Sequence, residues 1–167
     1  TLRGADATKT RVMAELQRAT AVVHLATHGS EDGLFFAGPT EAEAKLSLAD
    51  VYGLRMKAKV VVLSACDTFK GEVRSDGVVG IARAFLAAGA ESLVATLWTV
   101  VDSSTPRFMG LFYDWWLSGA CDSITAVQRA MSEMIAEEND NGEAKYGVLD
   151  WAPFVLYGES SFADAPN

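Results

Sequence analysis

The sequence has 167 residues, half of them hydrophobic, which suits one compact domain with a buried core. Its 14 lysine and arginine residues against 22 aspartate and glutamate residues give a formal net charge of −8. This charge disfavours nucleic acid and anionic membranes as partners, whereas a basic peptide would be attracted. No apolar run reaches the roughly 18 residues of a membrane span. The presence of only two cysteines favours a reducing, intracellular compartment, and their spacing with the two histidines gives no zinc signature. Neither a metal nor an organic cofactor is expected.

The first predicted element is an amphipathic helix over residues 8–18, capped by Thr8. Residues 21–27, AVVHLAT, then form a short apolar run that predicts a strand buried on both faces, with His28 at its carboxyl end. A turn-rich insertion follows, with a short extended piece inside residues 33–38. Residues 47–50, SLAD, predict a capping box that opens a short helix.

Residues 59–64, KVVVLS, predict a second buried strand, and Cys66 lies just beyond it. The next helix is expected to start at Ser75 or Asp76 and to stop at Gly89. A third strand is expected over residues 93–98.

The C-terminal part predicts two helices, one with Pro106 in its first turn and one starting at Ser123, and then a last strand over residues 154–157. The second of these helices is expected to turn five apolar residues inward: Ile124, Val127, Met131, Met134 and Ile135. Strands that alternate with helices predict an α/β fold, in which a mostly parallel sheet is covered on both faces as a three-layer αβα sandwich.

His28 and Cys66 both follow predicted strands, at the sheet edge where α/β proteins place their functional crevices. If the strands are neighbours, their ends are about 5 Å apart, so the side chains can meet. His28 would then take the proton of Cys66 and later protonate a leaving amine. The N–H groups of Gly29 and Cys66 would form an oxyanion hole. Each residue also has a structural interpretation, Cys66 as a small buried hydrophobe and His28 as a strand end.

Two motifs, HLATHG at residues 24–29 and VVLSACDT at residues 61–68, resemble the CHAT domain family, a caspase-like domain often joined to tetratricopeptide repeats. The resemblance continues through residues 75–90 and LWTVVD at residues 97–102. It implies a fold of the caspase-hemoglobinase type and a catalytic pair of His28 and Cys66, with His24 as a core or supporting histidine. Caspase-type sheets usually have six strands, so we expect the N-terminal strands to be missing and residues 1–167 to be a single CHAT domain of a larger chain.

In the related separases, a motif similar to LWTVVD ends in an acidic residue that contacts the substrate's arginine. The resemblance therefore implies that Asp102 binds a basic side chain before the scissile bond and that Trp98 lines this pocket. An equally weighted alternative makes Asp102 a carboxylate at the start of the following helix. Asp67 and Asp76 are weaker candidates, and Cys121 is expected to be incidental.

The leading interpretation is thus a cysteine endopeptidase that cleaves after arginine or lysine in a protein or peptide substrate. A tetratricopeptide-repeat region or another regulatory protein is an expected partner. The second interpretation is a silent caspase-like scaffold, for which Trp115 and Trp116 would be the contact surface if they are exposed. A nucleotide-binding domain ranks third, because the sequence has neither of the glycine-rich phosphate motifs.

Overall fold

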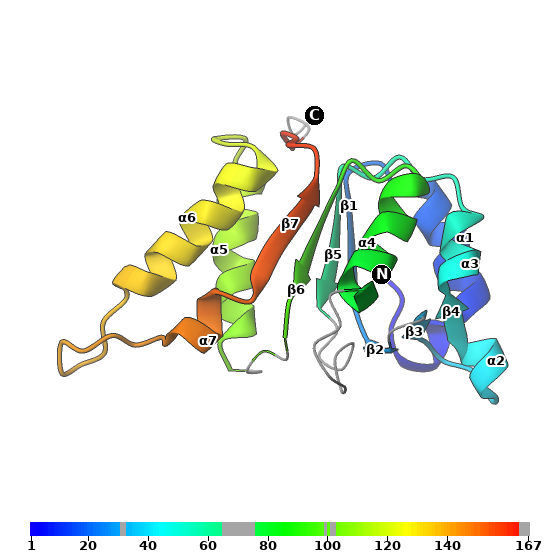
Figure 1. Ribbon diagram of the computed structural model, residues 1–167, viewed down its shortest axis with the longest axis horizontal. Helices are drawn as coiled ribbons and strands as arrows, with labels where there is room; N and C mark the ends of the chain where they lie inside the picture. Colours follow the sequence, from blue (N-terminus) through cyan, green and yellow to red (C-terminus); the bar gives the residue numbers. More distant parts are fainter. Residues whose placement is uncertain (31–32, 65–75, 99, 101–102, 164–167) are drawn as a thin grey trace.

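The computed structural model describes the chain apart from residues 31–32, 65–75, 99, 101–102 and 164–167, and describes residues 76–79 by their backbone alone. A four-stranded sheet lies between two layers of helices, so the predicted three-layer α/β fold is confirmed (Figure 1). The strand order is β1-β5-β6-β7, with the first three strands parallel and β7 antiparallel to β6. The strands are β1 (Val22–Ala26), β5 (Val60–Ser64), β6 (Ser92–Thr96) and β7 (Phe154–Gly158).

Helices α5 and α6 lie on one side of this sheet, and α1, α3 and α4 lie on the other (Figure 1). Their bounds are α1 (Lys9–Arg18), α3 (Leu48–Tyr52), α4 (Asp76–Ala87), α5 (Thr105–Leu117) and α6 (Ser123–Ala136). A second, three-stranded antiparallel sheet consists of β2 (His28–Ser30), β3 (Gly33–Phe35) and β4 (Lys45–Ser47). Three short helices complete the description: η1 (Gly4–Asp6), α2 (Glu41–Ala44) and α7 (Val148–Trp151). No helix in the described ranges combines the length and the apolar character that a bilayer span requires.

Strand β5 is buried on both faces, as its unbroken apolar sequence predicts. Val61 and Leu63 belong to the core under α1, α3 and α4, whereas Val60 and Val62 pack on the opposite side with Phe112 and Trp116. Because successive side chains of a strand alternate between faces, this one strand joins the two halves of the core.

Strand β1 corrects the prediction of a strand buried on both faces. Val23 and Leu25 are buried, but Val22, His24 and Ala26 on the other face are exposed. The physical reason is position: β1 is the last strand of the described sheet, and the helices on that side centre on its neighbours. The predicted loss of N-terminal strands stays a prediction, and the outer edge of β1 has no strand beside it among the described residues.

The predicted helix starts are confirmed by their caps. Thr8 accepts from the N–H of Arg11, and Ser47 forms a capping box with Asp50. Asp50 also pairs with Lys9 at 2.7 Å, which ties the start of α3 to the start of α1. Burial raises the pKa of Asp50, but hydrogen bonds from Lys9 and Ser47 outweigh it, and the net pKa lies below its ordinary value.

The predicted inward face of α6 is wrong in part, although Val127 and Met134 are buried as expected. Ile124 and Ile135 are about half exposed, since the buried stripe of α6 is rotated toward its small residues. That stripe consists of Ser123, Ala126, Val127, Ala130 and Met134.

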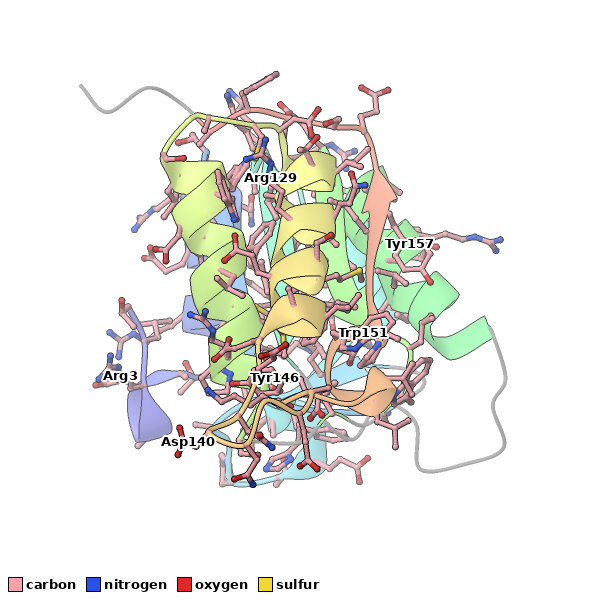
Figure 2. The ribbon with its side chains drawn as sticks, turned by 90° about the vertical axis from the view of Figure 1, so that its left-hand side faces the viewer. Arg3, Arg129, Asp140, Tyr146, Trp151 and Tyr157 are labelled. Carbon is pink, nitrogen blue, oxygen red and sulfur yellow. The ribbon has the colours of Figure 1, made fainter. Side chains whose placement is uncertain are left out.

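Trp116 is fully buried and donates to the carbonyl of Ser161 at 2.9 Å. Trp115 is half buried, with Arg129 of α6 stacked 4.2 Å from its ring centroid and its N–H donating to Glu133. Trp116 therefore does not meet the condition of exposure under which it would be a scaffold contact surface, and Trp115 meets it only in part. Figure 2 looks onto this side of the molecule, with Arg129 near the upper end of the two helices.

The stop at Gly89 allows a stability prediction. Gly89 has a φ of 110°, and a Cβ there would lie 2.4 Å from the carbonyl oxygen of Met56. We expect Gly89→Ala to lower the free energy of unfolding by about 2 kcal/mol or more, measured by urea denaturation. Gly110→Ala in α5 is the matched control, because nothing lies within 4 Å of its added Cβ. The control should be neutral or slightly stabilising, and equal losses in both variants would contradict the argument.

The contact between β1 and α5 allows a pH prediction. Nδ1 of His24 lies 2.9 Å from the hydroxyl oxygen of Tyr113. Tyr113 shields one side of the otherwise exposed imidazole. This partial desolvation lowers the pKa of His24 from its ordinary 6.5, and burial raises the pKa of Tyr113 to about 12, so neutral forms of both side chains are favoured. The stability gained from neutral His24 is complete above pH 6.5 and is lost as the pH falls through 6.5 and the lowered value.

We therefore expect the wild-type unfolding free energy to fall between pH 7.5 and pH 5.5 by more than that of His24→Gln, in urea titrations. Tyr113→Phe should keep most of the pH dependence, because its ring still buries the imidazole. An equal fall in wild type and His24→Gln would show that His24 does not contribute.

Candidate active site

The candidate site lies where the parallel strands end, at the lower end of the sheet in Figure 1. Strands β1 and β5 are neighbours, as predicted, and their last paired residues are Ala26 and Ser64. His28 and Cys66 each follow these residues by two positions. Since neighbouring strands lie about 5 Å apart, the chain leaves both strands side by side and at the same height. Cys66 itself lies outside the described residues.

His28 is exposed and does not simply end a strand, because it begins a new one. It is the first residue of β2 and pairs with Phe35 of β3. The next residue, Gly29, is buried and pairs with Leu34. The role of the Gly29 N–H in an oxyanion hole stays a prediction.

The small sheet that carries His28 is anchored in the core. Leu34 of β3 and Leu46 of β4 face each other and are both fully buried. Beyond β3, the N–H of Phe36 donates to Ala44 and the N–H of Ala37 donates to Ala7, each at 2.9 Å. The segment that holds His28 is thus fixed to the layer of α1 and α3 rather than suspended as a loop.

The small sheet differs from the sequence-based expectation, which includes an extended piece around β3 but neither β2 nor β4. The available signal was the short apolar centre of each strand, Leu34 in GLF and Leu46 in KLS. Strands of three residues are too short for alternation to identify them.

Trp98 occupies the equivalent position on the next strand. Strand β6 ends at Thr96, earlier than predicted, so Trp98 follows it by two residues, as His28 and Cys66 follow their strands. Its side chain is half buried, and its indole N–H is shielded from solvent without a hydrogen-bond partner in the described structure. Trp98 therefore brings an unused donor to the same edge of the sheet. The pocket-lining role of Trp98 stays a prediction.

Asp102, the expected contact for a basic side chain, lies outside the described residues, as does Asp67, and the side chain of Asp76 is not described. Helix α5 begins at Thr105, close after Asp102 in the chain. Both interpretations of Asp102, as substrate ligand or helix-end carboxylate, remain predictions.

Two candidate residues lie apart from this edge. His24 points to the α5 side, where it contacts Tyr113, so it is a partly exposed structural histidine rather than a core residue. Cys121 is buried near the ends of α5 and α6, with its Sγ 3.7 Å from the carbonyl oxygen of Trp115. Burial raises the pKa of the Cys121 thiol, which lowers its thiolate fraction and its reactivity. The described residues contain no cluster of three side chains able to hold a metal ion.

A groove of about 1250 Å³ runs along the outer edge of β1 as far as His28. Its other walls come from the N-terminal segment, α1 and the end of β3. The crevice expected from the sequence lies beyond the carboxyl ends of the parallel strands, and His28 lines the groove at that end of β1.

The sequence matches the CHAT domain family over residues 1–159. It is also 33% identical over 129 residues to tetratricopeptide repeat protein 28 of Mus musculus and, to the same extent, to that of Homo sapiens. These alignments cover 77% of this chain but only 5% of either relative. The chain therefore spans a small part of the relatives it matches, and it belongs to the CHAT domain family, a caspase-like fold that is found in tetratricopeptide-repeat proteins.

Proposed function

We propose that this domain is a cysteine endopeptidase that cleaves after arginine or lysine, with Cys66 as nucleophile and His28 as general acid and base. The observation that carries the proposal is the register of β1 and β5, whose last pair precedes His28 and Cys66 by two residues on each strand. A histidine held within reach of a thiol is what thiolate formation at neutral pH requires.

The reaction follows from these two side chains. His28 takes the thiol proton of Cys66, and the thiolate sulfur attacks the scissile carbonyl carbon. The N–H groups of Gly29 and Cys66 donate to the resulting oxyanion. When the C–N bond breaks, the proton on His28 goes to the departing amine, leaving a thioester on Cys66. Water, deprotonated by His28, then hydrolyses the thioester and restores the thiol.

Substrate preference would come from the segment after β6. Asp102 supplies a carboxylate for a guanidinium or ammonium group, and Trp98 supplies an apolar wall and the indole donor. The net charge of −8 attracts basic peptides over a longer range.

The relatives favour a second candidate, a binding module without catalysis. Both are named for tetratricopeptide repeats, and the matched region is a small share of each. In that case the dyad would be inert, and the domain would act through its surface within a larger assembly. Reactivity of Cys66 separates the two candidates.

The first test uses a peptide electrophile with arginine next to its reactive ketone, followed by peptide mass spectrometry. We expect Cys66 to be alkylated in the wild type and His28→Ala to slow this reaction by a factor of roughly 100 to 10,000, the usual range for losing a general base. Cys121→Ala is the matched control and should leave the rate unchanged, because Cys121 is buried away from the strand ends. Labelling of Cys66 at the same slow rate with and without His28 would favour the binding module.

The second test concerns Asp102. We expect Asp102→Asn to reduce cleavage after arginine by about 100-fold relative to cleavage after an uncharged isostere such as citrulline, because a buried charge would lose its partner. Asp114→Asn, an exposed change on α5, should leave that ratio unaltered. If Asp102 is instead a helix-end carboxylate, its variant loses about 0.3–1 kcal/mol of stability and keeps the arginine preference.

A further inference from the structure

We propose that Thr27 is a positioning residue for His28, acting through the hydrogen bond from its hydroxyl to the carbonyl oxygen of Phe35. The geometry that holds the backbone of His28 is independent of catalysis, whereas the effect of Thr27 on the reactivity of Cys66 rests on the proposed function.

Thr27 stands at the junction of two sheets. The chain leaves the main sheet after Ala26, bends at Thr27 and enters the small sheet at His28. The bend lies between the two strand ladders, so the backbone pairing that fixes its neighbours does not extend over it. The direction in which His28 leaves the main sheet depends on this one residue.

The acceptor of the hydrogen bond is the residue opposite His28. Phe35 pairs with His28 across β2 and β3, so the hydroxyl ties the residue before His28 to the residue across from it. A rotation at the bend would move Thr27 away from the carbonyl of Phe35. The branched side chain of threonine suits this role, because its χ1 is restricted more than that of serine.

Phe35 is itself a fixed point. It lies between the fully buried Leu34 and the paired N–H of Phe36, and β4 holds its other side through the pairing with Lys45. The carbonyl of Phe35 therefore belongs to the anchored part of the small sheet. The hydroxyl of Thr27 therefore ties the bend to this anchored part.

His28 is exposed, so the orientation of its backbone matters for where its ring lies. An exposed ring on a three-residue strand gains little orientation from core packing. Acid and base chemistry requires a side chain held within about half an ångström of its working position. A valine at position 27 would preserve the shape of the side chain and remove the donor.

The first experiment measures the position of His28 without reference to catalysis. The protein has two histidines, His24 and His28, so imidazole NMR signals can be assigned with one variant of each. Thr27→Val should shift or broaden the His28 signals and leave those of His24 unchanged. Thr20→Val is the matched control, an exposed threonine at the opposite end of β1. Unchanged His28 signals in Thr27→Val would overturn the proposal, whatever the activity of the domain.

The second experiment measures the consequence for Cys66. The rate of alkylation by the arginyl electrophile is followed from pH 5 to pH 9. Thr27→Val should lower the neutral-pH rate by about 10- to 100-fold and move the profile toward that of an ordinary thiol, near pH 8.5. Thr27→Ser should restore most of the rate, and Thr20→Val should equal the wild type.

The two experiments distinguish failure of the positioning role of Thr27 from failure of the peptidase proposal. If the wild-type rate depends on His28 but Thr27→Val reacts like the wild type, the positioning role fails and the peptidase proposal stands. If the wild-type rate does not depend on His28, the peptidase proposal fails, and the NMR comparison alone decides the role of Thr27.

Discussion

The parallel pairing of β1 with β5 is the constraint on which the rest of this structure depends. It sets Ala26 beside Ser64, and His28 and Cys66 each follow two residues later in the sequence. The pairing is held by burial, since β5 packs into both halves of the core while Val23 and Leu25 of β1 face the α1 side. A slip of one residue would turn those side chains to the opposite face, so the hydrophobic pattern enforces the register.

Around this pairing, the two sheets fix different parts of the site. The larger sheet determines where β1 and β5 end, and the smaller sheet holds the backbone of His28 through its pairing with Phe35. The smaller sheet succeeds with few residues because Leu34 and Leu46 enter the main core. The ion pair of Lys9 with Asp50 connects α1 and α3 in the same layer, although such a partly exposed pair adds little free energy by itself.

Much of the fold was predictable, since burial and backbone caps leave clear traces in sequence. The apolar run of β5, the threonine cap of α1 and the capping box at Ser47 were all recognised from local pattern. The exposed face of β1 was not, because its apolar residues resemble those of a central strand and its place in the sheet is a tertiary property. The predicted inward face of α6 was wrong for a similar reason. Close packing of α6 against α5 through the small residues Ala126 and Ala130 outweighs the burial of the larger Ile124 and Ile135. Of the site, the neighbouring carboxyl ends of β1 and β5 were predictable from two apolar runs, whereas the hydrogen bond from Thr27 to Phe35 depends on pairing that no short strand reveals.

The uncovered edge of β1 has a consequence for the behaviour of this domain in solution. Natural sheets protect such edges with lysine, proline or a bulge, and the VVHLA sequence of β1 has no lysine or proline. Its backbone groups face a groove rather than a strand in the described structure. An isolated copy therefore carries a template for edge-to-edge association with other copies, which strengthens with concentration and weakens when the edge is occupied. The net charge of −8 opposes that association, so added salt, which screens the charge, promotes it.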